Sequence, residues 1–250
     1  MAQIFRPSVN SISRMILLGL GLLPWIIIYV GSTMSRSPYN TKVGVEIGQP
    51  VPFSHIHHAN ELGIDCRFCH TTVETSSFAS YPPTHTCMSC HSQIWTNSPL
   101  LAPVRNSFAN NTPIKWNIVN HVPDFVYFNH SIHINRGVSC NQCHGPVQNM
   151  PITYKGETLF MTWCLGCHRE PERFLYKDKE AAAKGLTPRQ QVFNLYLKYQ
   201  SGAPLTPKER SLLEGVGYDP TEKEMEEGKA LVRDLKINKD HLDDCTICHH

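Results

Sequence analysis

The sequence predicts a mainly α-helical protein with much irregular coil, in which one N-terminal transmembrane helix precedes a domain of low regular secondary structure. Three observations lead to this prediction. An uncharged apolar run lies near the N-terminus, five C-x-x-C-H motifs are spread over residues 66–249, and residues 169–240 are charged, helical in pattern and free of cysteine and histidine. The formal net charge is +2, without a block of like charges of the kind that binds nucleic acid.

The apolar run extends from Met15 to Val30 without a charge, and through Met34 it is long enough to cross a bilayer. Arg6 and Arg14 precede it without an acidic neighbour, which predicts a cytoplasmic N-terminus and a periplasmic remainder. Because no convincing small-x-small cleavage site closes the run, we expect residues 1–34 to be an uncleaved anchor instead of a cleaved secretory signal. Residues 35–52, punctuated by proline and glycine, are predicted to be a linker.

The five C-x-x-C-H motifs have the spacing of c-type haem attachment sites. Two thiols three positions apart can add to the two vinyl groups of one porphyrin, and the adjacent histidine then binds the iron. The motifs use every cysteine of the chain: Cys66, Cys69, Cys87, Cys90, Cys140, Cys143, Cys164, Cys167, Cys245 and Cys248. The predicted proximal ligands are His70, His91, His144, His168 and His249. A zinc site would leave the histidine after each pair unexplained, and C-x-x-C spacing is poor for a long-range disulfide. The prediction is therefore five covalently attached c-type haems.

An internal duplication organises residues 53–168. A phrase F-x-H-x-x-H precedes the first motif and recurs before the third, at an offset of 75 residues for the histidines and 74 for the cysteines. Each copy continues into a second motif, so residues 53–91 (the first repeat) and 128–168 (the second repeat) each carry two haem sites. The repeated histidines are the predicted distal ligands of four irons: His55, His58, His130 and His133.

The fifth iron has no ligand assigned by the repeat. Met150 and Met161 both lie among the haem sites, and thioether ligation by either would give a haem of higher potential than its bis-histidine neighbours. A further histidine is the alternative. The histidines outside the repeat pattern are His57, His85, His121, His241 and His250, of which His57 is interpreted as a bystander.

Little periodicity is found between His70 and Gly156, so haem faces are expected to supply much of the core in the domain of residues 53–250. Residues 169–240 form a helical insert, with apolar residues at helical spacing over 190–198 and a capped helix at 206–214 that starts at Thr206 and Pro207. Residues 219–235 predict another amphipathic helix. Residues 241–250 then carry the fifth haem site.

With these motifs in this order behind one anchor, the chain resembles the pentahaem cytochrome c subunit of alternative complex III. The resemblance rests on F-x-H-x-x-H before C-x-x-C-H, Pro82–His91, Asp124–His130 and Met161–His168. The paired sites also resemble the cytochrome c3/c7 superfamily. The resemblance implies that an iron–sulfur subunit, NrfD-like quinol-binding membrane subunits and a monohaem cytochrome assemble with this chain. It also implies a soluble periplasmic electron acceptor, either a cytochrome c or a copper protein.

Three functions compete. The preferred one is an electron-transfer subunit without catalysis of its own, which passes electrons from quinol oxidation in a respiratory or photosynthetic complex to a periplasmic acceptor. A quinol dehydrogenase of the NapC/NirT type is the alternative, but the C-x-x-C-H-x-M expected at its first haem is absent, since residues 66–72 read CRFCHTT. A multihaem reductase would need an open iron position, whereas candidate distal ligands outnumber the irons.

Overall fold

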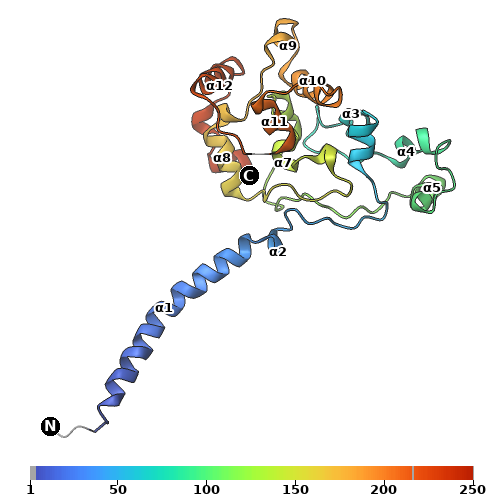
Figure 1. The fold of residues 1–250 in the computed structure, drawn as a ribbon. Helices are drawn as coiled ribbons and strands as arrows, with labels where there is room; N and C mark the ends of the chain where they lie inside the picture. Colours follow the sequence, from blue (N-terminus) through green and yellow to red (C-terminus); the bar gives the residue numbers. More distant parts are fainter. Residues whose placement is uncertain (1–3, 216, 250) are drawn as a thin grey trace. The chain divides into compact units, whose positions relative to one another are not determined.

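The computed structural model describes residues 4–215 and 217–249 and divides the chain into two compact units, Met1–Val43 and Gly44–His250 (Figure 1). The first unit consists of α1 (Ser8–Arg36) and the single turn α2 (Pro38–Thr41), which falls within the predicted linker. α1 continues through Pro24, none of its side chains is buried, and its most apolar window has a mean hydropathy of 2.1. By length and composition this helix can cross a membrane. An N-terminal signal sequence would meet the same two criteria.

The second unit is built from short helices joined by irregular chain. Its first half contains η1 (Ile56–Glu61), α3 (Cys66–Cys69), α4 (Thr84–His91), η2 (Pro99–Leu101), α5 (Ala102–Asn110), α6 (His130–Asn135), α7 (Asn141–His144), η3 (Val147–Asn149) and α8 (Met161–Arg169). Its second half contains η4 (Pro171–Arg173), α9 (Lys179–Ala183), α10 (Pro188–Gln200), α11 (Pro207–Glu214), α12 (Glu222–Asp234), η5 (Lys239–His241) and α13 (Cys245–Cys248). Within the described residues there is no β-strand, only an isolated antiparallel bridge between Glu46 and Tyr154. The predicted fold class, mainly helical with much coil, is confirmed.

Every C-x-x-C-H motif lies on a short helix, namely α3, α4, α7, α8 and α13. The helical insert, α9 to α12, is the orange-to-red part of the ribbon, with α11 beside α7 (Figure 1). One apolar core joins this insert to the two repeats. It contains Val192, Phe193, Leu195 and Tyr196 of α10, Leu212 and Leu213 of α11, Ile134 of α6, Tyr176 and Val73.

In the insert, α11 starts at the cap that the sequence predicts. Thr206 accepts a hydrogen bond from the Glu209 amide and the Glu209 side chain accepts one from the Thr206 amide, which closes a capping box at α11. Thr221 and Glu224 do the same at α12. Glu209 is nevertheless buried, and Lys198 donates to both of its carboxylate oxygens at 2.8 Å. Burial by itself would raise the pKa of Glu209, but the hydrogen bonds from Lys198, Thr206 and Tyr176 outweigh it and lower the pKa.

The packing of α12 on η4 requires a glycine. Gly228 lies in the middle of α12, and a Cβ atom there would overlap the main-chain carbonyl of Glu172, which is part of η4. Behind this contact, Leu231 and Val232 of α12 pack with Leu175 in a second, smaller apolar cluster. Glycine is unfavourable inside helices, so close approach of the two backbones is the physical reason for its presence.

Replacing Gly228 by alanine is expected to lower the free energy of unfolding by about 1–3 kcal/mol through overpacking. Alanine favours an isolated helix over glycine by about 1 kcal/mol, so propensity alone predicts the opposite sign. Denaturant unfolding followed by circular dichroism measures the difference. The matched control is Lys229→Ala at the exposed neighbouring position, which should change stability by no more than about 0.5 kcal/mol. A more stable Gly228→Ala protein would contradict the close packing.

Candidate haem sites

Histidines from the two repeats lie in facing pairs. Each pair joins the histidine of a C-x-x-C-H motif to a histidine of an F-x-H-x-x-H phrase, with 6.2 Å between ring centroids. The pairs are His58 with His91, His130 with His144, and His133 with His168. The structure therefore brings together six of the eight histidines predicted to ligate the first four irons.

This ring separation matches what a haem iron needs. A metal–imidazole bond is about 2 Å long and the ring centre lies about 1 Å beyond the bound nitrogen, so two imidazoles on opposite faces of one iron have centroids about 6 Å apart. In the His130–His144 pair the two rings are within 4° of parallel. The residues present thus fit a bis-histidine haem at these three motifs.

The two remaining histidines predicted to ligate the first four irons are His55 and His70. Burial lowers the pKa of His55 to about 4, and the positive charge that His70 can carry is the next largest cause. His70 is thus the ionisable group that acts most strongly on His55. Burial likewise lowers the pKa of His144 to about 4, with His130 as the next cause. Both rings are held in the neutral form that binds metals.

A hydrogen bond to the main chain fixes the orientation of most of these rings. In seven of them Nδ1 lies 2.7–3.1 Å from a carbonyl oxygen: His58 to Ser54, His70 to Ser80, His91 to Ile94, His130 to Ser77, His133 to Asn129, His168 to Leu242, and His249 to Phe125. A carbonyl only accepts, so Nδ1 must carry the proton. Nε2 is then left with its lone pair, which is the arrangement of an iron ligand.

The two repeats also share a phenylalanine contact for which the sequence assigned no role. Phe53 stacks on His58 at 4.5 Å and meets His55 edge-on at 4.9 Å. Phe128 stacks on His133 at 4.6 Å and meets His130 edge-on at 4.8 Å. The phenylalanine of each F-x-H-x-x-H phrase therefore supports both histidines, and its recurrence at the same spacing was the signal that could have identified it.

The copies differ in one turn of backbone. Eleven positions separate His55 from Cys66 but ten separate His130 from Cys140, which accounts for the unequal offsets of the repeat. The shorter copy forms an ordinary α-helix, α6, whereas the longer one forms η1, a π-helix with a wider turn. The phrase itself has the same length in both copies, so the extra residue lies between His58 and Cys66. The π-turn of η1 accommodates it without changing the contacts of Phe53 with His55 and His58.

The other histidines have different partners. His57 lies 2.9 Å from Glu61 and stacks on Trp95, His121 places Nε2 3.8 Å from Asp124, and His241 lies 2.8 Å from Asp244. His85 lies on α4, two residues before Cys87. His250 lies outside the described residues. In the described part of the chain no group of three or more His, Cys, Asp or Glu residues is arranged to hold a metal ion.

The two candidate methionines have contrasting surroundings. Met150 is only 1 % exposed, and its methyl group lies close to Gly145, next to His144. Met161 is 61 % exposed and begins α8. His249 of the fifth motif is oriented by the Phe125 carbonyl and has the Phe125 ring 5.7 Å away. Whether either methionine ligates the fifth iron remains a prediction.

The ten cysteines form no disulfides in the structure. Burial raises the pKa of Cys66, Cys143 and Cys167 to about 12. Cys66 and Cys140 also pack against the apolar core. All ten positions remain predicted attachment points.

The chain is similar to known multihaem proteins over part of its length. Residues 126–185, which include the third and fourth motifs, match the model of the family "Cytochrome c7 and related cytochrome c". A stretch of 97 residues is 39 % identical to the "Menaquinone reductase, multiheme cytochrome c subunit" of Nitratidesulfovibrio vulgaris (strain Hildenborough), and covers 38 % of this chain. The match spans 45 % of that relative, less than half of its length. Neither match names alternative complex III. Together with the paired imidazoles, both support the interpretation of this chain as a multihaem c-type cytochrome.

Proposed function

We propose that this chain is a membrane-anchored pentahaem cytochrome c that passes electrons from quinol oxidation in a multi-subunit complex to a periplasmic electron acceptor. The observation that carries the proposal is the set of three imidazole pairs at 6.2 Å, each of which joins a C-x-x-C-H motif to a repeated distal histidine. Haem supplies one-electron iron chemistry in such a protein.

The ligand arrangement favours electron transfer over catalysis. An iron with an imidazole on each face has no open position for a substrate, and the Nδ1 hydrogen bonds hold both rings in place. Four such sites are proposed, with His55–His70 as the fourth pair. A multihaem reductase would need a vacant face at one iron, whereas in the two repeats three motif histidines have an imidazole partner at 6.2 Å and His55 is proposed as the partner of the fourth.

The setting of the protein is also part of the proposal. α1 would anchor the chain in the cytoplasmic membrane, with its N-terminus in the cytoplasm and the haem domain in the periplasm, because Arg6 and Arg14 flank the apolar run. By resemblance to alternative complex III, the partners would be an iron–sulfur subunit, NrfD-like membrane subunits and a monohaem cytochrome, with a soluble cytochrome c or copper protein as acceptor.

A second candidate function is electron transfer in the opposite direction, into the quinone pool. It is favoured by the relative that is 39 % identical, whose name describes a menaquinone reductase. The proposed ligands are compatible with either direction, because the reduction potentials of the donor and the acceptor decide which way electrons pass through a row of haems. A quinol dehydrogenase of the NapC/NirT type remains the alternative with a different partner, a periplasmic reductase.

For the fifth iron we propose Met161 over Met150. Met161 and Cys164 are three positions apart on α8 and therefore lie on one face of that helix. The thiol of Cys164 is close enough to Cys248 of the fifth motif for the charge of one to raise the pKa of the other. Met150 is instead buried, with its methyl group close to Gly145, next to His144 of the third motif.

The first prediction compares two neighbouring histidines of η1. His58→Ala is expected to leave five covalent haems, counted by intact-protein mass, and to convert one of them to a high-spin, carbon monoxide-binding form. His57→Ala, the matched control, should produce no high-spin haem, because His57 lies outside the imidazole pairs. Low-temperature EPR of the oxidised protein reports the spin states. Equal spectra for the two variants would refute the ligand assignment.

The second prediction concerns the fifth iron. Met161→Leu should remove the near-infrared charge-transfer band of His/Met coordination and create one high-spin haem. Met150→Leu should keep that band and cost less than about 1.5 kcal/mol of stability, because leucine conserves the volume of a buried methionine. The opposite pattern would transfer the role to Met150, and a spectrum with five bis-histidine haems would point to a further histidine.

The direction of electron flow gives the third prediction. In native membranes under anaerobic conditions, added menaquinol should reduce the haems faster than menaquinone oxidises the pre-reduced haems, as followed in the α-band region of the spectrum. The reverse order of rates would favour the second candidate function. If the haems respond to neither quinol nor quinone, the proposed link to quinone is refuted, whereas the proposed haem ligation is not affected.

A further inference from the structure

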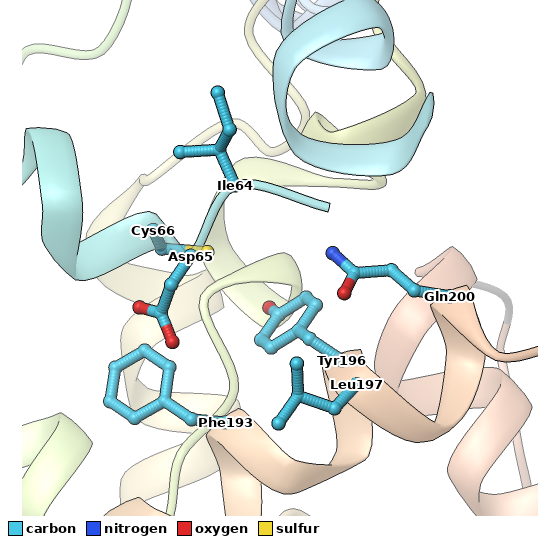
Figure 2. Close-up of a pocket in the computed structure, with 7 residues that line it drawn as sticks. All are labelled: Ile64, Asp65, Cys66, Phe193, Tyr196, Leu197 and Gln200. Carbon is cyan, nitrogen blue, oxygen red and sulfur yellow. The ribbon is translucent and has the colours of Figure 1, made fainter. Parts of the chain in front are cut away.

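The helical insert lies against both repeats through one helix, α10. On the side of the first repeat, the Arg67 guanidinium lies 4.2 Å from the centre of the Phe193 ring. Gln200 donates to the Ala59 carbonyl at 2.6 Å. Figure 2 shows Cys66, the first residue of the first motif, and its neighbour Asp65 facing Phe193, Tyr196 and Gln200 of α10 across a cavity with room for about one water molecule.

The same helix reaches the third motif through the hydroxyl of Tyr196. This hydroxyl donates to Asn141 Oδ1 at 2.5 Å and lies 3.2 Å from Ser139 Oγ, on the two residues that flank Cys140. Asn141 in turn donates to Gln148 and to the Leu213 carbonyl at the end of α11. The side chains of Ser139, Asn141 and Tyr196 are all buried. Asn141 is one of the two variable positions inside C-x-x-C-H, so the insert forms hydrogen bonds with a residue of the haem motif itself.

Cys66 and Cys140 both lie near the Tyr196 ring. Both pack against the apolar cluster that contains Tyr196, and Cys66 and Tyr196 line the same small cavity. The repeats are also joined beside this point, since His130 and Ser131 donate their amides to the carbonyls of Ser77 and Ser76. The first motif of each repeat thus faces the first motif of the other.

The remaining neighbours follow from the ligand pairs. His130 and His133 lie three positions apart on α6, which ties the third motif to the fourth. His55 and His58, also three apart, tie the first motif to the second. The fourth motif is joined to the chain leading into the fifth, because His168 Nδ1 bonds the Leu242 carbonyl and Arg169 pairs with Asp243.

We propose that Tyr196 is a positioning residue shared by the first and third haem sites of the chain. These are the first site of each repeat, so Tyr196 joins the two repeats at this point. The five haem sites then form one unbranched row in the order second, first, third, fourth, fifth. The insert of residues 169–240 contacts both repeats here and holds the first and third haem sites next to each other. The inference rests on the proposed haem ligation, and it makes the second and fifth sites the two ends at which partners exchange electrons.

The test is Tyr196→Phe in the full-length holoprotein, with Tyr199→Phe as the matched control. Tyr199 lies on the same helix and its hydroxyl bonds Asn149, outside every motif. In a potentiometric titration resolved into single haems, Tyr196→Phe should shift two components, each by about 2- to 10-fold in its reduction equilibrium, the range of one hydrogen bond. The control should shift none.

The identity of the two components is checked with marker variants. His58→Met and His133→Met each raise the potential of one haem and so label the second and fourth sites. The components moved by Tyr196→Phe should be two others. A shift of one component, of none, or of either labelled component would overturn the shared position of Tyr196.

Two further readouts keep the proposal testable. If Tyr196→Phe yields no holoprotein, Ser139→Ala removes a hydroxyl neighbour while the phenol ring stays, and the same two components should move. Haem number is counted by mass in every variant. Fewer than five haems in the unmodified protein would refute the proposed function, whereas five haems with the wrong components moved would refute only the role of Tyr196.

Discussion

The hydrogen bond between a histidine Nδ1 and a main-chain carbonyl is the interaction on which the haem sites depend. It is a short-range contact that sets the tautomer, turns the ring and ties the ring to the backbone at once. Much of the irregular chain is explained by it. Ser80 has a left-handed backbone, with φ of 60°, and its carbonyl is the acceptor for His70. A main-chain carbonyl that accepts a hydrogen bond from a histidine ring is oriented by that ring and not by the regular hydrogen-bond pattern of a helix or strand.

The sequence could predict the fold class, the apolar helix and the capped helix at 206–214, because each is encoded in neighbouring residues. Thr206 and Glu209, for example, form their capping box within four positions. The eight ligands proposed for the first four irons could likewise be read from a duplicated phrase. Which distal histidine faces which motif could not, since His133 and His168 are far apart in the chain and meet only in the folded structure.

The contacts that the sequence did not reveal share a physical cause. Tyr196 and Asn141 are ordinary residues in an amphipathic helix and in the variable part of a motif, and their meaning arises from a hydrogen bond between positions 55 residues apart. From the sequence, Gly228 likewise looks like a residue that only destabilises its helix, and its role becomes clear from the position of the Glu172 carbonyl beside it. Close approach between distant segments leaves no periodicity to detect.

The wide turn of η1 has a consequence for how such duplicated proteins can diverge. The two histidines of the phrase have the same spacing in both repeats, so the added residue lies after His58, before Cys66. Phe53 and Phe128 make the same two contacts with the histidines of their own repeat, so the phrase keeps its geometry despite the added residue. After a gene duplication, a change of length can thus be tolerated in the chain between a distal histidine and the next attachment cysteine, while the spacing of the two histidines stays fixed.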